Sequence, residues 1–199
     1  MINKEERLEL YYSLIKGLDE LSEVDKRLIK NSLRIRIELS DESDRGCVLL
    51  GSSYIENQLK ILLEKILIGT KKHKKDLFSG YGPLSTFSSK IKLSYSLGII
   101  SENLYKELEI IKSIRNLFAH YPDKISFDNV EIIKLCNKLK LSYKIKKEES
   151  AKRLFLSSTS QVLGLLDIEY IKAKQFNEKK DELDNHFLED KILEIKSFF

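Results

Sequence analysis

The chain has 199 residues, a mass of 23.2 kDa and a net charge of +4, which suits one domain with a substantial core and a heavily charged surface. Only two Pro and eight Gly are present, so the composition favours long helices over a turn-rich β fold. Two widely separated Cys and three His exclude a disulfide scaffold, a zinc finger and a His-rich metal site.

Apolar residues recur at helical spacing through the first third of the chain. The spacing predicts a helix over residues 8–18, a second helix that begins at Ser22 and continues to Leu39, and a third helix that ends at Gly69. Residues 40–44 form a polar break with good N-cap candidates for the third helix.

The next segment, from Thr70 to Leu84, is predicted to be an extended loop because it combines a lysine run with a Gly-Tyr-Gly-Pro turn. A short helix follows over residues 87–95 and stops near Gly98. Ser101 can cap another helix, and that helix ends close to His120 because Pro122 disfavours helical geometry at the residue before it.

Helical spacing continues to the C-terminus. Asp128 and Glu131 are predicted to cap a short helix through Cys136, and a long helix is expected over about residues 148–174. Residues 177–199 are expected to form a charged helical extension. Since no stretch alternates like a strand, the sequence predicts a single all-α domain over residues 1–199, a bundle of long antiparallel helices with one extended loop.

The chain carries no apolar run of the roughly 20 residues that span a membrane. Its N-terminus is acidic and lacks an apolar signal region, so we expect a cytoplasmic protein without a membrane partner. No cluster has the spacing of metal ligands, and we expect neither a metal nor a cofactor.

One group of residues stands out as candidate chemistry: Arg115, Asn116 and His120 at the end of an amphipathic helix. Asn116 and His120 share a face, whereas Arg115 and His120 diverge by roughly 140° around the helix. Two such helices about a two-fold axis could pool their Arg and His in one cleft. Arg115 would then neutralise a phosphate and His120 would transfer a proton, without a metal. Alternatively, Arg115 caps backbone carbonyls or pairs with a Glu, and His120 simply ends the helix.

The run Arg115-Asn116-Leu117-Phe118-Ala119-His120 resembles the R-x4-6-H signature of the HEPN superfamily. Residues 44–51 and 55–59 resemble the helix that opens the mannitol-repressor (MltR-like) branch of that superfamily, and residues 80–100 resemble its most distinctive stretch. The resemblance covers about residues 40–140. It implies a HEPN-type helical bundle that forms a homodimer through the helices carrying the motif.

For function, the resemblance implies either of two activities. HEPN toxins and phage-defence nucleases cleave RNA without a metal, whereas the mannitol-repressor branch is regulatory. Because this chain keeps both Arg115 and His120, we expect a metal-independent endoribonuclease with Asn116 as the orienting residue. An RNA substrate and an antitoxin or other regulatory protein are the expected partners. The alternative is a non-catalytic regulator that binds a protein or nucleic acid.

Two weaker signals accompany the motif. Lys71, Lys72, Lys74 and Lys75 could contact RNA phosphates, although a solvated charge run is an equally good interpretation. Glu56 lies on a mostly apolar helix and could support Arg115 from behind, or it could form an interhelical salt bridge.

Overall fold

The computed structural model describes residues 22–120, 124–141, 150–178 and 194. These residues form helices and no strands, so the all-α prediction is confirmed. The helices are α2 (Glu23–Ser40), α3 (Asp44–Ile66), α4 (Lys71–Phe78), α5 (Phe87–Ser96), α6 (Glu102–His120), α7 (Val130–Cys136) and α8 (Ala151–Lys172). The helix expected over residues 8–18 and nearly all of the expected C-terminal extension lie outside the described residues. None of the described helices combines the length and the apolarity needed to cross a membrane.

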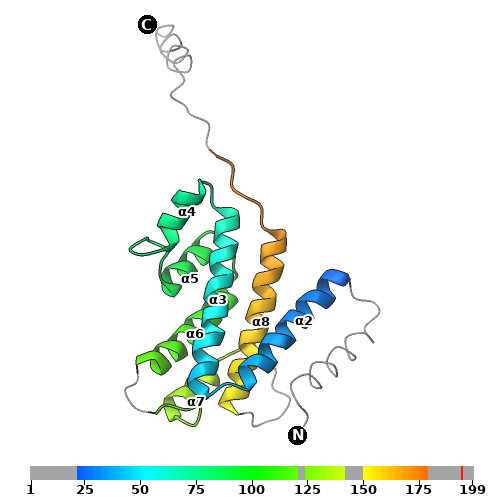
Figure 1. The fold of residues 1–199 in the computed structure, drawn as a ribbon, viewed down its shortest axis with the longest axis vertical. Helices are drawn as coiled ribbons and strands as arrows, with labels where there is room; N and C mark the ends of the chain where they lie inside the picture. The colour runs from blue at the N-terminus through cyan, green and yellow to red at the C-terminus, as the bar shows by residue number, and fades with distance from the viewer. Residues whose placement is uncertain (1–21, 121–123, 142–149, 179–193, 195–199) are drawn as a thin grey trace.

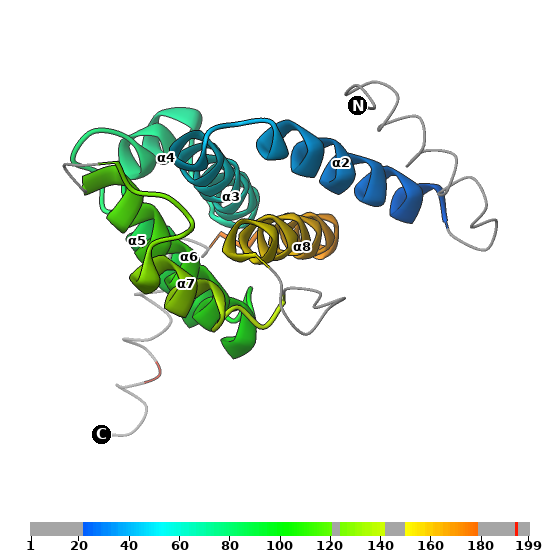
Figure 2. The same cartoon turned by 90° about the horizontal axis from the view of Figure 1, so that it is seen from below.

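Helices α3 and α8 form the centre of the bundle (Figure 1). Helix α2 packs on one side of this pair, and α5 and α6 cover the other side, as the view from below also shows (Figure 2). The predicted antiparallel arrangement holds for α2 and α6 against α3, but α3 and α8 run parallel. Asp44 pairs with Lys152 where both helices begin, and Lys65 reaches the Tyr170 carbonyl where both end.

A glycine lets the central helices approach closely. A Cβ atom on Gly51 would lie 3.3 Å from Leu39 Cδ1 and 3.4 Å from both Phe155 Cε1 and Thr159 Cγ2. Because these atoms belong to α2 and α8, Gly51 of α3 sits where three helices meet. Phe155 and Leu39 are fully buried there, so this contact anchors the core.

An aromatic chain fixes the end of α6, where the Arg/His motif lies. The ring centroids of Phe118 and Phe127 are 5.3 Å apart, and those of Phe127 and Phe155 are 5.8 Å apart. These tilted contacts join α6, the segment before α7, and α8. This aromatic packing therefore holds the C-terminal turn of α6 against the bundle.

The predicted loop over Thr70–Leu84 is partly wrong, because its first half forms the two-turn helix α4. The Thr70 side chain caps this helix by accepting from the His73 backbone N–H at 3.2 Å. Phe78 and Leu84 then bury themselves beside Leu63 of α3. The lysine run lacks an apolar stripe, so hydrophobic spacing alone could not reveal the helix.

The turn after α4 depends on glycine. Gly80 has a φ of +60°, and a Cβ atom on Gly82 would lie only 2.2 Å from the Asp76 carbonyl oxygen. The backbone can therefore fold directly back onto the end of α4, where the Gly82 N–H donates to the Ser79 carbonyl.

A second correction concerns α7, which is capped by Asn129 and not by the predicted Asp128 and Glu131.

Candidate functional site

The predicted catalytic residues lie on the solvent side of the last turns of α6. Its buried stripe faces the core through Leu108, Ile111 and Phe118. Arg115 is half-buried, and its Nη1 donates to the Asn116 Oδ1 at 3.2 Å, whereas Asn116 and His120 are exposed. The structure thus brings Arg115 and Asn116 together. Within the described part of the protomer, no contact joins Arg115 to His120.

Glu56 does not support Arg115 within the protomer, contrary to one of the two sequence-based interpretations. It forms the interhelical salt bridge that was the alternative, with its Oε1 2.7 Å from Lys90 Nζ of α5. Lys90 is only 3% exposed and also donates to the Ser85 carbonyl at 3.1 Å. This pair fastens α5 to α3, so both charges serve the fold.

Glu107 is a buried carboxylate that the sequence analysis missed. Its oxygens accept from the backbone N–H groups of Lys140 and Leu141 at 2.9 and 3.1 Å, and from the Ser158 hydroxyl at 2.6 Å. These contacts tie the segment after α7 and helix α8 to α6. Glu107 looked like one of many surface acids because its donors lie 33, 34 and 51 residues away in the chain.

The four lysines proposed to contact phosphate do not behave alike. Lys74 is partly buried, and its Nζ donates to the Glu64 carbonyl at 2.7 Å, which ties α4 to α3. Lys71, Lys72 and Lys75 are exposed on α4. The sequence grouped all four by their proximity, but helical geometry turns one of them inward.

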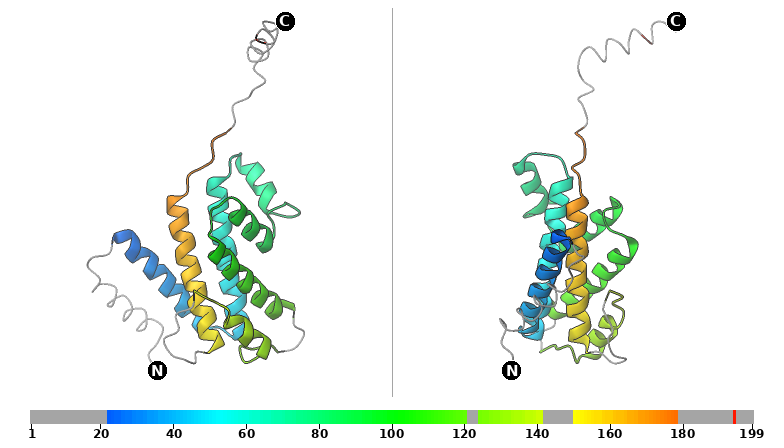
Figure 3. Two further views of the ribbon diagram at one scale, coloured as in Figure 1. Left: turned by 180° about the vertical axis from the view of Figure 1, so that it is seen from behind. Right: turned by 90° about the vertical axis from the view of Figure 1, so that its right-hand side faces the viewer.

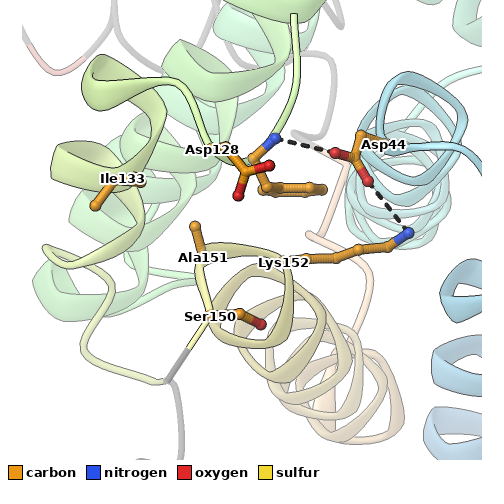
Figure 4. Close-up of a pocket in the computed structure, with 7 residues that line it drawn as sticks. Asp44, Asp128, Ile133, Ser150, Ala151 and Lys152 are labelled. Carbon is orange, nitrogen blue, oxygen red and sulfur yellow. Dashed lines mark hydrogen bonds and ion pairs between the residues drawn. The ribbon is translucent and has the colours of Figure 1, made fainter. Parts of the chain in front are cut away.

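A pocket of about 370 Å³ opens where α3, α7 and α8 meet (Figure 4). Asp44 spans its rim by accepting from the Phe127 N–H at 3.0 Å and pairing with Lys152 Nζ at 3.3 Å. Lys152 also donates to the Glu42 carbonyl at 2.8 Å. Ile133 lines the pocket, and Val130 lies one helical turn earlier on α7; the two are 37% and 66% exposed. An apolar edge therefore borders a pocket in which Asp44 and Lys152 are already paired with each other.

The two cysteines are buried, Cys47 in α3 and Cys136 in α7. Burial raises the pKa of each thiol to about 12, so both stay protonated at neutral pH. A thiol nucleophile requires the opposite shift. In the described residues, no group of three or more His, Cys, Asp or Glu side chains is placed to hold a metal ion.

Comparisons with known proteins point to one family. The mannitol repressor family model matches residues 41–165. Two curated relatives, the mannitol operon repressors of Escherichia coli K12 and of Escherichia coli O6:H1 strain CFT073, are each 33% identical over 57 residues. That match spans 29% of this chain and 29% of each relative, less than a third of their length.

A solved structure shares the fold. It is the X-ray structure of the MtlR–HPr complex from Escherichia coli, which matches with a TM-score of 0.57 at 17% identity. The match covers 68% of this chain and 97% of that one. At this identity the likeness concerns the fold alone.

These findings contradict the prediction of a toxin-like or antiviral endoribonuclease, because the matching family and the curated relatives are operon repressors. Arg115 and His120 do not by themselves indicate catalysis, since an Arg and a His at this spacing are compatible with an ordinary helix end. The mannitol-repressor resemblance and the regulatory alternative were the better guide. With the family model matching well over half of its residues, the chain belongs to the mannitol repressor family.

Proposed function

We propose that this chain is a non-catalytic regulator that acts by binding a protein partner, and that HPr is its first candidate partner. The observation that carries the proposal is the family match over residues 41–165. The fold likeness to a repressor solved in complex with HPr supports a protein as the partner. A homodimer, a cytoplasmic location and membership of the wider HEPN superfamily stay predictions.

The chemistry of the described polar groups supports a binding role. Glu107 and Lys90 are buried, but the hydrogen bonds and the ion pair described above already occupy them. Active sites instead keep titratable groups available in a cleft with their pKa values matched to the reaction. The buried thiols of Cys47 and Cys136 are shifted away from reactivity.

We place the partner on the apolar edge of α7. Val130 and Ile133 project beside the pocket at the start of α8. In the free protein their apolar side chains are in contact with water, and burying them against a partner would be favourable. Protein interfaces combine apolar anchors in their centre with a polar rim. Asp128 and Ser150, which also line the pocket, supply polar groups around this edge.

The test is a calorimetric titration of the purified chain with purified HPr. We expect saturable binding, because the family fold is compatible with that partner. The double variant Val130→Asp with Ile133→Asp should lose most of the affinity. Absence of heat and of co-elution at high concentrations of both proteins would contradict HPr as the partner. Cleavage of RNA by the purified chain would contradict the non-catalytic role.

A further inference from the structure

Helix α4 carries positive charge that the described part of the protomer leaves unpaired. Lys71, Lys72 and Lys75 are exposed, and no described carboxylate lies within ion-pair distance of any of them. The neighbouring Lys74 differs from these three lysines, because its ammonium group donates a hydrogen bond to the Glu64 carbonyl. Three cations therefore share one short helix, and the one carboxylate of that helix, Asp76 near its C-terminal end, forms no ion pair with any of them.

The position of these lysines makes the imbalance larger. The N-terminus of a helix carries the positive end of the macrodipole, which favours acidic residues in the first turn. Helix α4 has no acidic residue there and instead begins with Lys71 and Lys72. An acidic segment that docks on this end would satisfy the helix dipole and the lysines together.

The C-terminal segment of the same chain leaves the bundle beside this helix (Figures 1 and 3). After α8, the Phe176 N–H donates to the Ile66 carbonyl at 2.8 Å, and Gln175 Nε2 donates to the Leu67 carbonyl at 3.2 Å. Glu178 lines a pocket of about 480 Å³ together with Thr70, the N-cap of α4. Residues 175–178 therefore lie beside the N-terminus of α4.

Lys179 and Lys180 come next in the sequence, and an acidic run follows them. Residues 181–190 contain five carboxylates and no Lys or Arg; the carboxylates belong to Asp181, Glu182, Asp184, Glu189 and Asp190. Only two residues separate Glu178 from this run. A chain extends by up to about 3.3–3.6 Å per residue, whereas the eight residues of α4 span roughly 12 Å, so the run can reach all three lysines.

We propose that the lysine face of α4, formed by Lys71, Lys72 and Lys75, is the docking site of the acidic segment 181–190 of the same chain. The segment neutralises the positive charge of this face. The acidic segment lies beyond the residues that the family model matches, whereas α4 lies within them. This contact does not depend on the identity of the regulator's partner.

Tyr81 provides an apolar contact for the same segment. Its side chain is fully exposed, and it stands on the glycine-dependent turn that follows α4. Phe187 and Leu188 lie between the two groups of acids in the segment. With the first acids on Lys71 and Lys72, these two apolar residues come within reach of the Tyr81 ring at the other end of α4.

The test uses the full chain with a nitroxide spin label on His186→Cys. Cys47 and Cys136 are buried with raised pKa values, so the introduced thiol is the one that reacts at neutral pH. We expect the amide signals of residues 71–76 to lose intensity relative to those of α7. Raising the salt to about 1 M, where the Debye length falls to about 3 Å, should restore them.

Charge variants decide whether the lysines are responsible. Lys71→Gln, Lys72→Gln and Lys75→Gln together should abolish the intensity loss. The control Lys124→Gln, Lys134→Gln and Lys138→Gln removes three other exposed lysines and should preserve it. Full intensity in the labelled wild type, or an intensity loss that survives the α4 variant, would overturn the proposal.

Two further outcomes name other occupants of the surface. Mixing isotope-labelled chains with separate spin-labelled chains detects contacts between copies, and broadening seen only in that mixture would overturn the intrachain assignment. Addition of HPr provides the second check. If the α4 signals are not broadened in the spin-labelled chain but shift when HPr is added, the surface would instead be assigned to HPr. Binding of HPr with the α4 signals still broadened supports both the docking and the proposed function.

Discussion

Helices α6 and α4 differ in whether their charged side chains have partners within the described structure. On the inner side of α6, Glu107 is buried and receives three hydrogen bonds from two other parts of the chain. On the outer side of α4, Lys71, Lys72 and Lys75 are exposed and form no ion pair with a described residue. The difference separates polar groups that specify the fold from those that remain available to a ligand or another segment.

The comparison extends to apolar residues. Phe118 and Phe155 complete the aromatic packing inside the bundle, whereas Val130 and Tyr81 contribute little to the core of the protomer. Removing a side chain of the first kind should destabilise the protein. Removing one of the second kind should leave stability unchanged and affect binding, and the following predictions test that division.

The largest effect is expected from Glu107→Ala. The change leaves the N–H groups of Lys140 and Leu141 and the Ser158 hydroxyl without an acceptor, and it opens a cavity. The free energy of unfolding should fall by about 4 kcal/mol. Urea denaturation measures this loss. The control Glu109→Ala removes only a helical pair with Lys112 and should cost less than about 1 kcal/mol. Equal losses would contradict the structural role of Glu107.

The Glu56–Lys90 pair predicts an asymmetry between its two partners. Glu56→Ala leaves the Lys90 ammonium buried with one carbonyl contact, and should cost about 2 kcal/mol after allowance for the partial exposure of Glu56. Lys90→Met removes the buried charge and should cost about 1 kcal/mol or less, since the Glu56 carboxylate can reach water. Thermal unfolding of both variants checks the order, and the reverse order would show that Lys90 is not the desolvated partner.

The helices themselves could be predicted because their signals are local. Ser43, Ser101 and Ser150 each accept from a backbone N–H three residues later, where the corresponding helix begins. The apolar residues of α6 that recur at helical spacing, Leu104, Leu108, Ile111 and Phe118, are buried in the structure, and Glu107 and Ile114 are buried with them. Helix α4 escaped because only Thr70 marked it, and a cap without an apolar stripe resembles any loop threonine.

The candidate site could be predicted less well because it depends on contacts distant in sequence. Helical spacing correctly indicated that Arg115 and His120 diverge, but it carried no information on whether the pair is used for catalysis. The burial of Lys90 and Glu107 depends on partners 33 to 51 residues away. Exposure of Val130 becomes visible only once α7 is placed against α6 and α8.

Substitutions on the exposed edge of α7 should change the affinity for HPr without changing the stability of the fold. Val130→Asp with Ile133→Asp places two charges on the exposed edge of α7 and should weaken HPr binding at least tenfold, which is about 1.4 kcal/mol. Titration calorimetry measures the change, and urea denaturation should differ from wild type by about 0.5 kcal/mol or less. The control Leu50→Asp with Leu97→Asp alters two other exposed apolar residues, which lie outside α7, and should keep the affinity. Unchanged HPr binding by the α7 variant would remove this edge as the partner site.

The smallest effect on stability is expected from Lys71→Gln, Lys72→Gln and Lys75→Gln together. These exposed ammonium groups have no ion pair with any described residue, and two of them oppose the macrodipole of α4. Their loss should change the free energy of unfolding by about 0.5 kcal/mol or less, since any contact with the acidic segment is itself solvent-exposed. Urea denaturation of this variant beside Lys74→Gln sharpens the comparison, because Lys74 is the α4 lysine that holds the Glu64 carbonyl. A larger loss from the triple variant than from Lys74→Gln would place the three lysines among the groups that specify the fold.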